Sequence, residues 1–546
     1  MKRITTAAGL ACMLAWALPA TAGISGPVST RAGQLEGVPG KDPAVTVFKG
    51  VAFAAPPVGD LRWKAPAPVQ PWQGVRKADQ FGDDCTQAPG NSTRNHKISE
   101  DCLNLNLWTA ASSASERRPV MVWLHGGGGT GSASSPQFDG EALARKGVVL
   151  VTVNFRLGVL SGLATPDLDR ESGHNASGNY SVMDVAAALR WVHDNIANFG
   201  GDPARVTVFG ESAGAGMTDY VAITPLAKGL FQRALAQSHV RYYKDPELFA
   251  LPTGWTSKAD AEAAGVKFVQ ATGAHSLAEL RAMRWEKLME VARTTPAGGG
   301  HVVDGYVIPL NNGDTFTQGR QNDVFYLSGD NKDESGASPD TAFDILTGGK
   351  KPATNFVATT KLSDYLTNAR NKFGKFTDEY LKLYPASNDR EAFLASSNAA
   401  RDNARVSSWM WNQLWKTKGT HPLFTYTWTH APPGPNHDLA GAFHGSEIVY
   451  VFGNAGPLWT DEDRRISDTM MSYWVNYAAN GDPNGPGLPK WPAWDGKSDT
   501  VMEIGDHYQP IPLAAPAKVA FWRKFYAAQS GMRPPQEAYQ ARAVRE

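Results

Sequence analysis

The chain of 546 residues is 42% hydrophobic and 19% charged, a composition that can bury a large core and excludes disorder over most of its length. Lysine plus arginine and aspartate plus glutamate both number 53, so the formal net charge is zero. Because nucleic-acid binding needs clustered excess positive charge, we expect no nucleic-acid partner.

The first 22 residues have the pattern of a signal peptide. Lys2 and Arg3 precede an apolar run over residues 7–19, and the small-residue sequence Ala20-Thr21-Ala22 follows. We therefore expect residues 1–22 to be removed and the mature chain to be exported, to the periplasm or out of the cell. The apolar run is too short to cross a bilayer, and no other run reaches that length, so we expect no membrane anchor in the mature chain.

Two cysteines, Cys85 and Cys102, remain after removal of the signal peptide. Two cysteines in an exported protein are usually paired. A bridge that closes the loop between them would stabilise the fold by roughly 3 kcal/mol. Two free buried thiols are the alternative.

Apolar, β-branched runs alternate with helical periodicity in the middle of the chain. Residues 120–124, 148–154 and 206–209 are predicted to be buried strands. Residues 184–198 are predicted to be a helix whose apolar face comprises Val185, Ala188, Leu189 and Val192. This alternation favours an α/β fold with a mostly parallel central sheet flanked by helices.

Two further segments, residues 255–294 and 361–418, are predicted to be helical and are richer in charge. No linker rich in proline, glycine or serine separates them from the rest. We therefore expect them to be insertions around the core, and residues 23–546 to form a single domain.

The sequence Gly210-Glu211-Ser212-Ala213-Gly214 follows the strand predicted at 206–209. It matches the G-x-S-x-G pattern of a nucleophile elbow between a strand and a helix. The turn is so tight that side chains at the two glycine positions would clash, and it projects the Ser212 hydroxyl above the sheet. N–H groups at the start of the following helix can stabilise a developing negative charge. Ser212 is therefore the predicted nucleophile.

Several segments resemble the type-B carboxylesterases, the cholinesterase-like α/β-hydrolases that include bacterial secreted esterases. They are residues 48–53 with 56–59, 100–106, 153–158, 199–214, 444–448, and 473–474 with 480–483. The resemblance implies an α/β-hydrolase fold with long helical insertions around an active-site gorge, and catalysis without a metal or organic cofactor. It also assigns Cys85 and Cys102 to the family's first disulfide loop. Residues 86–101 contain no aromatic residue, which argues against a choline esterase.

A serine nucleophile needs a base, and the base needs a carboxylate that orients it. In α/β-hydrolases these residues follow one another in the order Ser, Asp or Glu, His. Several histidines follow Ser212, and the resemblance selects His444 among them. It selects Glu334 as the acid, after a predicted strand at 324–327, with Asp330 and Asp333 as alternatives.

The oxyanion hole needs backbone N–H groups that approach the substrate closely, which favours glycine. The resemblance implies Gly127, Gly128 and Ala213 as the donors. Gly129 stands where the family often has an aromatic residue, so we expect a roomier pocket there.

Three neighbouring residues are candidates for supporting roles. Glu211 and Ser238 match family residues beside the nucleophile and near the acid and base. His239 stands where the family usually has glycine, so it is a candidate substrate contact, and a packed histidine is the alternative reading.

These features together predict a serine carboxylesterase that hydrolyses a small-molecule ester through an acyl-enzyme. An amidase, carbamate hydrolase or lactonase with the same triad is one alternative. A non-catalytic binding protein on the same fold is the other.

Overall fold

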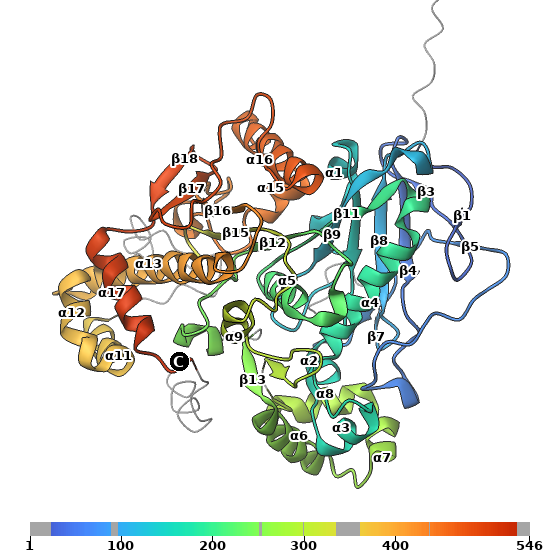
Figure 1. Cartoon of the computed structure of the whole chain (residues 1–546), viewed down its shortest axis with the longest axis horizontal. Helices are drawn as coiled ribbons and strands as arrows, with labels where there is room; N and C mark the ends of the chain where they lie inside the picture. Colours follow the sequence, from blue (N-terminus) through green and yellow to red (C-terminus); the bar gives the residue numbers. More distant parts are fainter. Residues whose placement is uncertain are drawn as a thin grey trace, which may run out of the picture.

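An eleven-stranded mixed sheet forms the centre of the molecule (Figure 1). The computed structural model describes residues 23–88, 97–250, 254–298, 300–334, 361–435 and 437–531, so the predicted signal peptide lies outside the described residues. The strand order across the sheet is β18 (Tyr508–Pro512), β17 (Thr500–Ile504), β16 (Leu423–Trp428), β15 (Phe325–Asn331), β12 (Arg233–Gln237), β11 (Gly201–Glu211), β9 (Arg118–Leu124), β10 (Val149–Val153), β8 (Asn104–Thr109), β4 (Thr46–Ala52) and β3 (Val38–Pro39).

The strands from β10 to β17 all run parallel, and antiparallel neighbours complete both edges. The mostly parallel sheet predicted from the sequence is therefore confirmed. The strands expected at 120–124, 148–154 and 206–209 correspond to β9, β10 and the second half of β11. The first half of β11 is set off by a shift in register between Gly201 and Val206, which the short apolar run could not indicate.

Alternate residues of β9 belong to two different buried clusters. Val120, Val122 and Leu124 pack in one cluster, while Met121 and Trp123 pack in the other. Successive strand side chains point to opposite faces, so the two clusters lie on the two faces of the sheet. Burial on both faces explains why these strands are continuously apolar.

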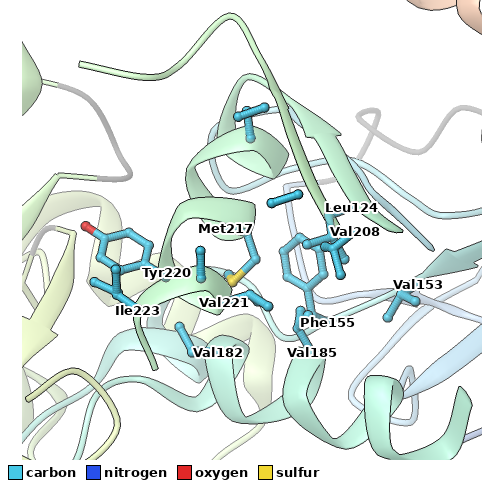
Figure 2. Packing of buried hydrophobic residues seen from close by; sticks show 14 of the residues in the cluster. Leu124, Val153, Phe155, Val182, Val185, Val208, Met217, Tyr220, Val221 and Ile223 are labelled. Atoms are coloured by element: carbon cyan, nitrogen blue, oxygen red, sulfur yellow. The ribbon is translucent and has the colours of Figure 1, made fainter. Parts of the chain in front are cut away.

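Helices α4 (Tyr180–Asn195) and α5 (Ala213–Ile223) contribute to the first cluster. Figure 2 shows Met217 and Val221 of α5 close to Val182 and Val185 of α4. The predicted apolar face of the first helix is confirmed, since its four residues are all buried. This helix begins at Tyr180, ahead of the expected start at residue 184.

The opposite face of the sheet is covered by α1 (Glu141–Arg145), α15 (Ile448–Phe452) and α16 (Asp461–Asn480). The start of α16 is fixed by a capping box, in which Thr460 and Asp463 exchange side-chain and backbone hydrogen bonds. Packing of α15 against the sheet fixes the chain that immediately precedes it, residues 441–447.

The segments predicted to be helical insertions surround this core. One comprises β13 (Trp255–Ser257), α6 (Lys258–Thr272), α7 (Leu277–Ala282), α8 (Trp285–Thr294) and β14 (His301–Val303). The other comprises α11 (Leu362–Phe373), α12 (Thr377–Leu383) and α13 (Asp389–Lys416), which α17 (Pro516–Ala527) joins (Figure 1). Phe268, Leu280 and Leu288 of the first segment share a buried cluster with the sheet, so this insertion packs directly on the core.

The remaining short elements connect these layers. They are the helices α2 (Gly158–Gly162), α3 (Pro166–Ser172), α9 (Asn312–Thr317) and α14 (His437–Ala440) and the strands β1 (Val28–Ser29), β2 (Gln34–Glu36), β5 (Val75–Lys77), β6 (Asp84–Cys85) and β7 (Ile98–Ser99). Within the described residues, no helix has the length and apolar character needed to cross a membrane.

Cys85 and Cys102 form a disulfide, with their Cα atoms 5.0 Å apart. Both residues are buried. The predicted pairing is confirmed, and the alternative of two free thiols does not hold.

Candidate active site

Ser212 occupies the sharp turn between β11 and α5. Its backbone has φ 55° and ψ −122°, a conformation that residues other than glycine rarely adopt. A Cβ atom at Gly214 would lie 1.9 Å from the carbonyl oxygen of Leu124, and one at Gly210 would lie 2.5 Å from the backbone of Gly214. A side chain at either glycine position would therefore clash with the backbone, which is the steric reason for the two glycines around Ser212.

His444 and Glu334 meet at the carboxyl ends of the parallel strands. His444 Nδ1 lies 2.5 Å from Glu334 Oε2, and the other carboxylate oxygen of Glu334 accepts a 2.7 Å hydrogen bond from the Asn331 amide. Burial alone would raise the pKa of Glu334. The charge and hydrogen bond of His444, the Asn331 amide and the Ser238 hydroxyl outweigh burial, so the pKa is lowered and Glu334 is ionised.

The opposite ring nitrogen of His444 faces the nucleophile elbow. His444 Nε2 lies 3.2 Å from Oε1 of Glu211, the residue immediately before Ser212. The structure gives no hydrogen bond between the Ser212 hydroxyl and this ring. The sequence-predicted residues Ser212, His444, Glu334 and Glu211 are thus brought into one cluster.

The two alternative acids have other partners. The Asp333 carboxylate contacts Arg401 and accepts a 3.0 Å hydrogen bond from the Ala442 amide. Burial raises the pKa of Asp330 to about 6, with the charge of Arg405 opposing that rise. Neither carboxylate contacts His444 in the described structure, so the geometry favours Glu334.

Glu447 is a buried carboxylate next to this cluster, and the sequence analysis assigned no role to it. Glu447 is 0% exposed and accepts hydrogen bonds from Gln237 Nε2 at 2.9 Å and from Asn331 Nδ2 at 2.6 Å. Gln237 precedes Ser238, and its side-chain oxygen accepts from Trp474 at 3.1 Å. The network ties the loop that carries Glu334 to the loop that carries His444. The only feature of the sequence that pointed to Glu447 was its position within the segment 444–448, which resembles the family.

Glu211 is a buried acid beside both Ser212 and His444. Burial raises its pKa to about 8, although the charge of His444 acts in the opposite direction. Glu447 and Glu334 add to the rise because they are like charges.

The glycine loop after β9 approaches the elbow closely. A Cβ atom at Gly126 would lie 3.1 Å from the Cβ atom of Ser212. Gly127, Gly128 and Gly129 have φ values of 110°, 59° and 105°, which favour glycine. Gly128 and Gly129 line a cavity together with Ala213, the first residue of α5. A Cβ atom at Gly129 would meet nothing within 4 Å, so the space next to this residue is open.

Both ends of this glycine loop are held in place. The His125 ring stacks on Phe155 at 4.5 Å, and its Nδ1 lies 3.0 Å from the Gly126 carbonyl oxygen. Gln87, from the disulfide loop, donates to the Gly131 carbonyl at 2.8 Å and accepts from the Gly131 amide at 3.0 Å. The sequence did not predict this role for Gln87.

Ser238 and His239 directly follow β12. Ser238 has φ 61°, and its amide donates to the Gly329 carbonyl at 2.7 Å. His239 is 8% exposed, and burial lowers its pKa to about 3, with the charge of Arg241 acting in the same direction. His239 is not among the residues that line the cavity, so the geometry favours a packed histidine over the candidate substrate contact.

The cavity beside the nucleophile elbow, lined by Gly128, Gly129 and Ala213, has a volume of about 320 Å³. Its walls come from the glycine loop, from residues 155–162, from α5 and from the end of the first insertion. Within the described ranges, no cluster of three or more His, Cys, Asp or Glu side chains could hold a metal ion.

Comparison with known proteins matches the chain to the carboxylesterase family over residues 25–522. A fumonisin B1 esterase from Sphingopyxis macrogoltabida is 33% identical over 530 residues, which cover 92% of this chain and 93% of that protein. Liver carboxylesterase 1F from Rattus norvegicus is 33% identical over 540 residues, which cover 90% and 91%. A solved structure of a PNB esterase is similar with a TM-score of 0.74 and 28% identity, over 91% of this chain and 99% of that one. The chain therefore belongs to the carboxylesterase family and is a carboxylic ester hydrolase on the α/β-hydrolase fold.

Proposed function

We propose that Ser212, His444 and Glu334 act as a catalytic triad that hydrolyses carboxylic esters through an acyl-enzyme. The contact between His444 Nδ1 and Glu334 Oε2, at 2.5 Å, carries this proposal, because it turns Nε2 towards the elbow. A carboxylate in this position fixes the tautomer of the base and stabilises the imidazolium that forms.

The first half of the reaction makes the acyl-enzyme. His444 Nε2 takes the hydroxyl proton as Ser212 Oγ attacks the ester carbonyl carbon. The resulting oxyanion accepts hydrogen bonds from the amides of Gly127, Gly128 and Ala213. The carbon–oxygen bond to the alcohol then breaks, and His444 gives its proton to the leaving alkoxide.

The second half returns the free enzyme. Water gives a proton to His444 and attacks the acyl carbon, and the same amides stabilise the second oxyanion. The bond to Ser212 Oγ breaks, Ser212 regains the proton, and the carboxylic acid leaves. Glu334 remains ionised throughout, in keeping with its lowered pKa.

The decisive experiment compares wild type with Ser212→Ala in the hydrolysis of p-nitrophenyl hexanoate. The variant should lose activity by several orders of magnitude while its circular dichroism spectrum is unchanged. A fluorophosphonate should label the wild-type chain on the tryptic peptide that contains Ser212. Wild-type rates in Ser212→Ala, or a label on another residue, would contradict the assignment. The p-nitroanilide of the same acid tests the amidase alternative on the same samples.

Export and a single domain are part of the proposal. The disulfide between Cys85 and Cys102 supports folding in an oxidising compartment. One sheet that contains strands from residue 38 to residue 512 supports a single domain. Mass spectrometry of the secreted or periplasmic protein should give an N-terminus at Gly23.

A further inference from the structure

The cavity lined by Gly128, Gly129 and Ala213 carries almost no net charge on the residues that the structure describes. Among those residues, Arg156 is the only charged one in its lining, and the Asp184 carboxylate holds the guanidinium group of Arg156 at 2.6–3.2 Å. More than half of the lining residues are glycine or alanine. A cavity of this kind offers neither a carboxylate for a substrate cation nor a free cation for a substrate anion, so it favours an uncharged substrate.

His301 places a polar imidazole ring in this largely apolar wall. It is the first residue of β14, and its amide donates to the Gly254 carbonyl at 2.7 Å. Its ring lies against Tyr220 of α5, with 3.9 Å between the ring centroids. The backbone and the ring are therefore both held in place, and the imidazole faces the cavity in a fixed orientation.

The two ring nitrogens of His301 have different surroundings. Nδ1 is buried and has no hydrogen-bond partner. Nε2 is not among the buried, unpartnered atoms, and no hydrogen bond to it is found in the described structure, so this nitrogen is accessible. Burial lowers the pKa of the ring to about 3, so it is neutral at physiological pH and carries one proton. A proton on Nδ1 would be stranded without an acceptor, whereas a proton on Nε2 can meet a molecule in the cavity.

We infer that His301 Nε2–H donates a hydrogen bond to a neutral acceptor oxygen of the substrate, remote from the ester group that is hydrolysed. The preferred substrates are then uncharged esters that carry an ether, carbonyl or hydroxyl oxygen on the acyl or alcohol chain. This inference rests on the proposed function, because it places the substrate in the cavity beside Ser212. His301 is a specificity residue under this assignment and takes no part in proton transfer.

The test uses pairs of substrates that differ in one atom. p-Nitrophenyl hexanoate is compared with its 3-oxa, 4-oxa and 5-oxa analogues, in which one CH₂ of the acyl chain is replaced by oxygen. Butyl hexanoate and 2-methoxyethyl hexanoate make the matching pair for the alcohol chain. The measured quantity is the ratio of kcat/KM for the oxygen-containing substrate to kcat/KM for its all-carbon partner. The intrinsic effect of the oxygen on reactivity is the same for every variant, so it cancels when these ratios are compared.

Four proteins are compared. His301→Phe keeps an aromatic ring against Tyr220 but has no donor, and His301→Gln restores an N–H near the position of Nε2. His174→Phe is the matched control, because His174 is an exposed histidine that also stacks on a tyrosine, Tyr306, at 3.9 Å, away from this cavity.

At one or more oxygen positions, we expect the ratio to fall roughly five- to tenfold in His301→Phe, the effect of losing one hydrogen bond to a neutral group. His301→Gln should recover part of the loss, and His174→Phe should match wild type. Equal ratios in wild type and His301→Phe at every position would overturn the inference while the proposed function stands. A well-folded wild type that hydrolyses none of these esters would instead count against the proposed function. If His301→Phe does not fold, His301→Leu, which also lacks a donor, takes its place, and wild-type ratios in that variant at every position would overturn the inference.

Discussion

The carboxylate of Glu211 lies 3.2 Å from Nε2 of His444, the nitrogen that the proposed mechanism uses to take the proton of Ser212. Glu334 occupies the opposite side of the same ring, at Nδ1. His444 is therefore flanked by a carboxyl group at each nitrogen. Burial would lower the pKa of His444, but the charges of Glu334 and Glu211 raise it above its usual value.

This arrangement predicts a shifted pH dependence. A general base works only when it is unprotonated, so kcat/KM should rise with pH through the raised pKa of His444. Glu211 is a carboxylate only above its own pKa of about 8, the range in which His444 loses its proton. Glu211→Gln removes that negative charge, lowers the pKa of His444, and should move the rising limb to lower pH by roughly one unit. Because the pKa of His444 is raised to about 10, the measurement is kcat/KM for an uncharged ester between pH 6 and 11, with the rate of hydrolysis without enzyme subtracted. If the midpoint of the rising limb is the same in Glu211→Gln and wild type, Glu211 does not influence the pKa of His444.

The identity of the acid gives a second prediction. Glu334→Gln should lower kcat by roughly a thousandfold or more, because a neutral amide no longer stabilises the imidazolium. Asp333→Asn is the matched control, since Asp333 binds Arg401 and the Ala442 amide instead of His444. It should keep most of its activity but melt at a lower temperature. The reverse result, an inactive Asp333→Asn beside a nearly normal Glu334→Gln, would assign the acid to Asp333.

Gln87 gives a third prediction, about the oxyanion hole. Gln87→Ala removes both hydrogen bonds that hold Gly131 at the end of the glycine loop. We expect kcat to fall roughly tenfold with little change in KM, because amides that are less well placed lose stabilisation of the transition state. Gln80→Ala, at an exposed position, serves as the control. A change confined to KM would argue that Gln87 shapes substrate binding instead.

The disulfide gives a fourth prediction. Replacing Cys85 and Cys102 with serine should lower the free energy of unfolding by about 3 kcal/mol, which denaturant titration can measure. Activity below the melting transition should also fall, since Gln87 lies two residues beyond Cys85. An unchanged unfolding curve would mean that the surrounding packing alone fixes this loop.

The sequence predicted those parts of the site that short segments encode. The elbow around Ser212 needs only a strand, two glycines and a serine, all of them contiguous. The central strands were predicted because burial on both faces makes them continuously apolar, as in β9. The disulfide was predicted from the expected signal peptide, from the small number of cysteines and from the family resemblance.

Features that depend on contacts between distant segments were not predicted. The role of Glu447 requires Gln237 and Asn331, which lie far from it in the chain. Gln87 and Gly131 are 44 positions apart in the sequence, so their pairing depends on the folded structure and not on a local pattern. His301 follows three glycines in the sequence, residues 298–300, and nothing local indicates that its ring faces the cavity. The sequence left His239 open between a substrate contact and a packed histidine for the same reason, since the burial of its ring depends on residues that are distant in the chain.

The position of the first insertion has a consequence for how the substrate preference of this protein can evolve. Its strands β13 and β14 pair with each other and belong to a sheet separate from the central one. Gly210 and Gly214 beside Ser212 tolerate no added atom, whereas residues 296–298, 300 and 301 line the cavity from outside that crowded turn. New substrate preferences can therefore evolve, or be engineered by exchanging residues 255–303 between relatives, while the reacting groups stay untouched.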